Sequence, residues 1–226
     1  MTLRRSTLSE THHGSSTVAH QFEDFEQQHE ADTLGIWTFL VTEIMFFGGL
    51  FAAYTVYRSF YLPGFEVGSR LLNIHLGAIN TVILLSSSFT MAMAVHSAQT
   101  AKRGALQLFL LLTIALGIIF LCVKGAEYHA DYVEGIIPGV HYVPEGKAGI
   151  EHVQLFMCFY FAMTSVHALH MIIGMAILLV LLFRERRGEF SAQYYAPMEV
   201  MGLYWHFVDV VWIFLFPLLY LIGGRY

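Results

Sequence analysis

Residues 155–183 read LFMCFYFAMTSVHALHMIIGMAILLVLLF and contain no Asp, Glu, Lys or Arg. A helix needs roughly 20 consecutive apolar residues to cross the hydrocarbon core of a bilayer, which is about 30 Å thick. This stretch is longer than that, so it predicts a transmembrane helix that tilts or protrudes. A barrel strand is excluded because the apolar residues are unbroken rather than alternating, and only a helix pairs its own backbone groups in lipid.

Four further apolar stretches accompany this one. The five predicted spans are Leu34 to Tyr57, Ile74 to Val95, Leu106 to Val123, Leu155 to Phe183 and Val200 to Ile222. Hydrophobic residues make up 56% of the 226-residue chain and charged residues only 13%, about half the usual charged share, and the mean hydropathy is +0.58. So few charges cannot cover a water-soluble surface. We therefore predict an all-α integral membrane protein, with a bundle of five transmembrane helices over residues 34–226.

The polar N-terminal segment, residues 1–33, differs from the rest of the chain. It is rich in His and then acidic, and it lacks the apolar core and the small-residue cleavage site of a signal peptide. We expect a flexible tail whose acidic end is able to form helix next to the first span. The formal net charge of the whole chain is −5, without a Lys/Arg cluster, which argues against nucleic acid as a partner.

The orientation of the spans follows from the Lys and Arg residues in their flanks. With the N-terminus inside, the inner side holds Arg4, Arg5, Lys102, Arg103, Arg184, Arg186 and Arg187, and the outer side holds Arg58, Arg70, Lys124, Lys147 and Arg225. The inner charges lie in short loops directly at helix ends, where the positive-inside rule operates. We therefore predict the N-terminus inside and the C-terminus outside.

The longest predicted connection, Lys124 to Gln154, faces outward in this arrangement. It carries several acidic residues, namely Glu127, Asp131, Glu134, Glu145 and Glu151. Such a charge run is either a solvated face or a contact for a basic partner or a neighbouring subunit.

Cysteine and tryptophan residues are expected near the ends of the spans. Cys122 and Cys158 are too few for a disulfide scaffold or a four-thiolate metal site. A disulfide between them is geometrically possible, although buried free thiols are commoner. We expect Trp37, Trp205 and Trp212 to anchor their rings at the lipid headgroups.

The most conspicuous ionisable residue inside a span is Glu43. A carboxyl group in hydrocarbon is costly unless it faces protein or water, so it marks a functional candidate. Glu43 shares one side of its predicted helix with Phe39, Phe46 and Phe47. It should be either protonated or hydrogen-bonded to another helix. Two interpretations of Glu43 remain. It belongs either to a proton-linked or lipid-linked site, or to a contact that only fixes helix packing.

Polar residues also occur at helical spacing in three other spans. His167 and His170 lie three apart in the fourth span, as do His206 and Asp209 in the fifth, while Asn80 and Ser87 lie on one stripe of the second. These faces are expected to look inward, as in helices that pack on each other. A metal or haem site is disfavoured, because His170 and His206 lie at depths about 10 Å apart and no paired Glu-x-x-His pattern is present.

At this point the sequence resembles a known family. The fragments GIWTFLVTEIMFFGGLFAAY (35–54), INTVILLSSS (79–88), LGIIFLCVKGAEY (116–128), FYFAMTSVHALH (159–170) and LYWHFVDVVW (203–212) occur in one order. They are similar to the conserved helices of cytochrome c oxidase subunit III, in which a buried glutamate precedes two phenylalanines and the final helix carries Trp, His, Phe, Asp and Trp. The resemblance covers about Leu34 to Ile222.

The resemblance implies a non-redox subunit of a proton-pumping terminal oxidase, like the short five-helix bacterial form. In that family a lipid-filled cleft divides the first two helices from the rest, and phospholipid occupies it. The chain itself is expected to bind no metal and no cofactor, whereas haem and copper belong to its partners, the catalytic subunit I and a copper-bearing or quinol-type subunit II. A larger respiratory supercomplex is a further partner. The expected location is the bacterial inner membrane.

The resemblance also assigns roles to residues. Glu43 corresponds to the family's buried glutamate near the lipid site, with His167 or His170 as its neighbour, and supports proton uptake and sustained turnover. His206 and Asp209 join this buried polar set, while Asn80, Ser87 and Glu127 are expected to fix helix packing.

Two alternatives remain beside this interpretation. One is the equivalent subunit of a quinol oxidase or of a nitric oxide reductase. The other is a small proton-conducting transporter that uses Glu43, His170 and Asp209 as a relay. Such a relay needs a continuous polar path, to which the third predicted span contributes almost nothing.

Overall fold

The computed structural model describes residues 25–139, 152–187, 195–221 and 223. Its elements, in chain order, are α1 (Phe25–Phe60), α2 (Leu62–Leu71), α3 (Ile74–Gln99), α4 (Arg103–Val133), α5 (Val153–Arg186), α6 (Ala196–Phe216) and the π-helical turn η1 (Pro217–Leu221). No strand occurs in these residues, and five of the helices are long and apolar enough to cross a membrane. The all-α prediction and the five predicted spans are therefore confirmed.

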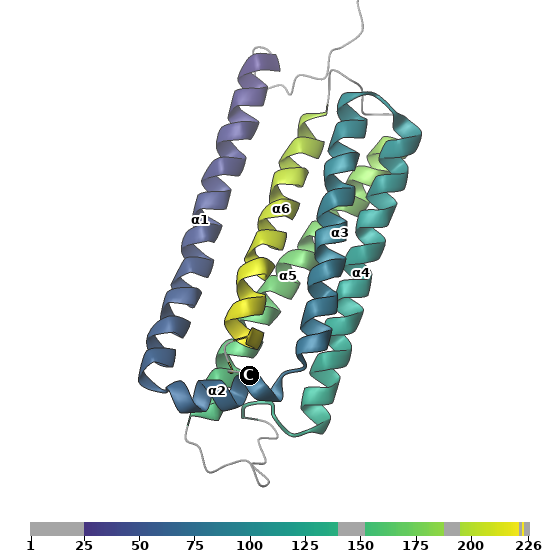
Figure 1. Ribbon diagram of the computed structural model, residues 1–226. Coiled ribbons are helices and arrows are strands. Elements are labelled where there is room, and N and C mark those ends of the chain that lie inside the picture. Colours follow the sequence, from purple (N-terminus) through teal and green to yellow (C-terminus); the bar gives the residue numbers. More distant parts are fainter. Residues whose placement is uncertain (1–24, 140–151, 188–194, 222, 224–226) are drawn as a thin grey trace, which may run out of the picture.

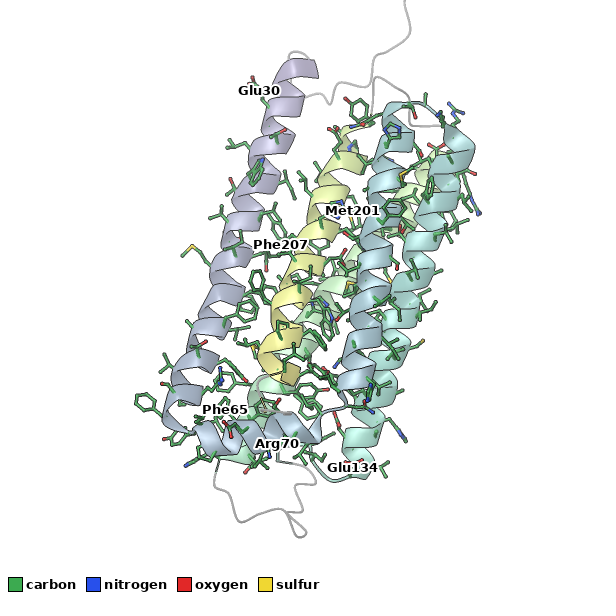
Figure 2. All side chains as sticks on the ribbon, viewed as in Figure 1. Glu30, Phe65, Arg70, Glu134, Met201 and Phe207 are labelled. Atoms are coloured by element: carbon green, nitrogen blue, oxygen red, sulfur yellow. The ribbon has the colours of Figure 1, made fainter. Side chains whose placement is uncertain are left out.

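The five long helices run alongside one another, and α2 lies across one end of the bundle (Figure 1). This end also holds η1, the start of α3 and the end of α4, and Figure 2 labels Phe65, Arg70 and Glu134 there. The helix α2 follows a single residue after α1 and begins with Pro63 in its first turn, where proline is favoured. Its buried Phe65 and Gly68 pack it on the bundle, chiefly against α5. This helix was not predicted from the sequence.

The helices extend beyond the apolar stretches that predict them. α1 begins at Phe25, so the acidic end of the predicted tail is helical up to Thr33, while residues 1–24 lie outside the described part. The largest extension is at the end of α4, which continues ten residues past Val123. The prediction of an outer loop that begins at Lys124 is thus partly wrong, because its first acidic residues, Glu127 and Asp131, are buried residues of α4. Glu145 and Glu151 lie outside the described residues.

The bundle is built around α6, whereas α1 lies on its edge. Half of the apolar window of α6 is buried, against 17% for α1. α3 packs mainly on α4 and α6, and α1 packs mainly on α6. The first two spans therefore do not form a pair opposite the other three, which corrects the expected division of the bundle. Figure 1 shows α1 separated from α3, with α6 between them.

Two of the three tryptophans lie in the core rather than at the headgroups. Trp205 and Trp212 are fully buried, and only Trp37 has an exposed ring. The indole Nε1 of Trp205 donates to Ser87 Oγ at 2.8 Å, and that of Trp212 donates to Thr81 Oγ1 at 3.1 Å. These bonds attach α6 to α3, so the expected anchoring role is wrong for both residues.

Candidate functional site: buried polar contacts between helices

Glu43 and His170 form a contact between α1 and α5. Glu43 Oε2 lies 3.1 Å from His170 Nε2, and the side chains are only 19% and 14% exposed. The other ring nitrogen, Nδ1, lies 2.8 Å from the carbonyl oxygen of Val166. A carbonyl only accepts, so Nδ1 must carry a proton. The Nε2 contact then needs a proton of its own, held either by the carboxyl group or by the imidazole. The pair is therefore a site for one shared proton.

Aromatic residues enclose this pair. The Phe47 ring lies 5.3 Å from the His170 ring, and Tyr204 donates its hydroxyl proton to the His170 carbonyl at 2.9 Å. On α1, Phe47 is buried and Glu43 is half-buried. The partly exposed ring of Phe39 lies 6.0 Å from the Tyr204 ring, whereas Phe46 is 50% exposed. The aromatic side predicted for Glu43 thus consists of Phe39 and Phe47 from α1 together with Tyr204 from α6.

His167 does not share the position of His170, although it lies only three residues away. It is 1% exposed, and its ring packs 5.6 Å from Phe120 of α4 and 5.2 Å from Trp212 of α6. Of the two expected neighbours of Glu43, the structure brings only His170 to it. Within the described residues, neither nitrogen of His167 has a hydrogen-bond partner.

The predicted polar residues of α3 and α6 meet at their interface. His206 Nδ1 lies 2.7 Å from Ser88 Oγ, and Ser87 accepts the hydrogen bond from Trp205. Asp209 and Asn80 are both buried, and their side-chain polar atoms have no partner among the described residues. Ser87 therefore joins two helices directly, whereas Asn80 and Asp209 make no direct polar contact of this kind.

A buried cluster around Lys124 joins the C-terminal part of α4, the N-terminal part of α5 and the turn η1. Lys124 Nζ donates to Glu127 Oε2 at 2.9 Å, Tyr160 Oη at 3.1 Å and Tyr220 Oη at 3.0 Å. Tyr220 donates in turn to Glu127 Oε1 at 2.7 Å. All three protons of the ammonium group and both oxygens of Glu127 are thus used. The ammonium group also lies 5.4 Å from the Trp212 ring centroid.

This Lys124 cluster was missed by sequence reasoning, which placed Lys124 in a flank and Glu127 among packing residues. The available signal is helical spacing. Phe120, Lys124, Glu127 and Asp131 lie at intervals of four, three and four residues and are all buried. This buried stripe continues past the point where the apolar stretch stops. It also corrects the expectation that the third span contributes almost no polar groups.

A groove of about 470 Å³ opens between α1, α3 and α6. Its wall is mostly apolar, with polar groups at one end, where Gln99 Nε2 donates to Glu199 Oε1 at 2.9 Å. The lining residues are Thr33, Ile36, Ala92, Val95, His96, Gln99, Ala196, Glu199, Val200, Gly202, Leu203 and His206. A long, mostly apolar chain with a polar head has the chemistry to fit this groove.

The cysteines and the acidic side chains form no metal site within the described ranges. No three or more His, Cys, Asp or Glu side chains gather there in a way that could hold an ion. Cys122 and Cys158 are free and exposed on the surface of the bundle. The disulfide considered as an alternative is therefore not formed, and the expectation of buried thiols is wrong.

These observations define a class of protein: a multi-pass helical membrane protein whose intramembrane polar groups are largely turned to neighbouring helices. The model of the family described as cytochrome c oxidase subunit III matches residues 16–224. This covers most of the chain and all of the described spans.

Individual proteins agree with this match. Cytochrome c oxidase subunit 3 of Synechocystis is 36% identical over 189 residues, covering 83% of this chain and 74% of the relative. The mouse protein of that name is 32% identical over 198 residues, covering 84% and 69%. Quinol oxidase subunit 3 of Bacillus subtilis is 30% identical over 216 residues, covering 96% and 98%. The chain belongs to the cytochrome c oxidase subunit III family and is subunit III of a haem-copper terminal oxidase.

Proposed function

We propose that this chain acts as a non-redox subunit that stabilises the catalytic subunit I of the oxidase and supports its proton uptake. A copper-bearing or quinol-type subunit II completes the complex, and haem and copper are held by these partners. The proposal rests on family membership together with the one-proton contact of Glu43 and His170. The bacterial inner membrane, with the N-terminus inside, is the proposed location, and association into a larger respiratory supercomplex is part of the same proposal.

The Glu43 and His170 pair is the feature of this chain that we assign to proton supply and turnover stability. A carboxyl group and an imidazole that share one proton keep zero net charge whichever of the two groups holds it. The pair also attaches α1, the least buried span, to α5. Loss of either side chain should therefore loosen α1 and disturb the proton environment beside the catalytic subunit.

Glu43→Ala tests this role in the purified oxidase. Removal of the carboxyl group takes away a hydrogen bond to a charged or proton-sharing partner, a type of bond worth about 1.5–3 kcal/mol. We expect unchanged haem absorption, because the proposal places haem in the partner subunits, but turnover that declines or stops early under continuous assay. Thr42→Ala is the matched control, since Thr42 is exposed and bonds only to the Phe39 carbonyl of its own helix. Bleached haem bands in Glu43→Ala would contradict the proposal.

We further propose that the groove between α1, α3 and α6 binds phospholipid. Its apolar wall suits an acyl chain and its polar end suits part of a headgroup. Val95→Trp should fill the groove and lower the amount of phospholipid that copurifies with the oxidase, measured by extraction and mass spectrometry. Leu108→Trp, on an exposed face of α4, is the control. Equal lipid content in both variants would remove the groove as a lipid site.

The transporter alternative is separated from this proposal by isolation of the chain. A subunit should copurify with a haem-bearing protein in mild detergent. A transporter should instead move protons or solute when the chain alone is reconstituted. The Lys124 cluster is polar, but it favours the interpretation as a subunit over that as a transporter. Its lysine and glutamate are hydrogen-bonded within the cluster rather than arranged as a path across the membrane.

A further inference from the structure

Seven of the described residues have buried side-chain polar atoms without a hydrogen-bond partner, and three of these residues lie away from the ends of the membrane-spanning helices. The unpaired atoms of these three are both oxygens of Asp209, both ring nitrogens of His167, and the amide oxygen and nitrogen of Asn80, judged against all described residues. The residues are 3%, 1% and 0% exposed, and each lies in a different membrane-spanning helix. A buried polar atom without a partner is costly, so native proteins pair nearly all of them with protein or with ordered water.

The three residues lie at one level of the bundle, marked by Trp212. The His167 ring lies 5.2 Å from the Trp212 ring, and Thr81, next to Asn80 in the chain, accepts the Trp212 hydrogen bond. Asp209 precedes Trp212 by three residues, about 4.5 Å along the helix axis. Asn80 faces α6, because Gly77 and Ser87 on the same stripe of α3 both meet α6 or the turn that follows it. The three residues therefore lie within about one helical turn of Trp212 along the bundle axis.

A polar route joins this level to the groove. His206 lines the groove, and its Nδ1 contacts Ser88 Oγ at 2.7 Å. Ser88 also lies beside the Asp209 carboxyl group, but neither carboxyl oxygen forms a hydrogen bond of standard geometry with a described residue. Small polar molecules that enter the groove thus find hydrogen-bonding groups at successive turns of α6, leading inward.

By contrast, Lys124 and Glu127 in the neighbouring cluster are paired. The Lys124 ammonium group makes three hydrogen bonds, and both oxygens of Glu127 are used. The level of Trp212 differs because it combines a carboxyl group, an imidazole and an amide that form no hydrogen bonds with described residues. Water, which both donates and accepts, matches this mixed set.

We propose that ordered water molecules bind between Asn80, His167 and Asp209, and that they enter from the groove past His206 and Ser88. The chain would then contain a hydrated polar seam inside its own bundle, separate from the Glu43 and His170 contact. This goes beyond the proposed support of subunit I, because it lets protons of the bundle interior exchange with water at the groove.

Radiolytic footprinting of the purified oxidase tests the seam. X-ray radiolysis of bound water forms hydroxyl radicals in place, which modify the side chains they touch even without surface exposure. Trp205 is the internal control, since it is as buried as Trp212, its Nε1 is bonded to Ser87, and its ring packs against Gly117 and Gly174. We expect Trp212 and His167 to be modified several-fold faster than Trp205.

The variant Asp209→Leu, which removes one water ligand, should lower the modification rate of Trp212 toward that of Trp205. Ser86→Ala is the matched control, because Ser86 is exposed and bonds only to Val82 of its own helix. If Asp209→Leu does not assemble, the wild-type comparison alone decides. Modification of Trp212 and His167 no faster than that of Trp205 would overturn the proposal, whether all three react slowly or all three react quickly.

Discussion

Lys124 illustrates how a charged residue is accommodated in the interior of this bundle. It is 3% exposed, and its charge is balanced by Glu127 and surrounded by the rings of Tyr160, Tyr220 and Trp212. A buried ion pair gains little over a well-packed apolar pair, but loss of one partner leaves the other charge uncompensated. The cluster is therefore sensitive to single substitutions and tolerant of a paired one.

Lys124→Met should destabilise the assembled subunit by about 3–5 kcal/mol, the usual cost of an orphaned buried charge. The double variant Lys124→Met, Glu127→Leu removes both charges and should recover part of this loss. Retention of subunit III during heating of the detergent-solubilised oxidase measures the effect. Lys102→Met, at an exposed residue before α4, is the control. If the double variant loses subunit III at a lower temperature than Lys124→Met, the argument from the orphaned charge is refuted.

At the scale of elements, the short helix α2 depends on close contact with α5. A Cβ atom added at Gly68 would overlap the ring of Phe156, whereas one added at Gly125 of α4 would meet no atom within 4 Å. Overpacking of a buried contact typically costs about 1–3 kcal/mol, while Gly to Ala in an open helix position gains about 0.5–1 kcal/mol.

We therefore expect Gly68→Ala to expose the segment between α1 and α3 to added protease, and Gly125→Ala to leave cleavage unchanged. Limited proteolysis of the solubilised oxidase, read by mass spectrometry, measures this difference. Equal cleavage of the two variants would mean that α2 does not rely on the Gly68 contact.

The sequence predicts elements better than it predicts their ends and partners. Each span follows from an apolar run, because hydrocarbon thickness sets its length. The end of α4 was missed because Lys124 reads as a flank charge until its partners are known, and these come from 36 and 96 residues further along the chain. Likewise, Glu43 contacts His170 and not His167 because of the way α1 packs on α5. Helical spacing alone does not determine this packing.

At the scale of the whole molecule, the buried Lys124 changes the charge balance that sets orientation. The positive-inside rule counts Lys and Arg in water-exposed flanks, and Lys124 is instead paired inside the bundle. Among the described residues, one end of the bundle then carries Lys102, Arg103, Arg184, Arg186 and Arg187, and the other carries Arg58 and Arg70. The bias toward an inner N-terminus is therefore stronger than the sequence count indicates.

Orientation can be measured with single cysteines in a Cys122→Ser, Cys158→Ser background. Glu134→Cys lies at the end of α4 and Lys102→Cys at its start, and both residues are exposed. A maleimide that does not cross membranes should label Glu134→Cys in spheroplasts, in which the cell wall has been removed but the inner membrane is intact. It should label Lys102→Cys only after the membrane is permeabilised, because about 30 Å of hydrocarbon separates the two positions. The reverse pattern would place the N-terminus outside and would mean that the basic end faces away from the cytoplasm.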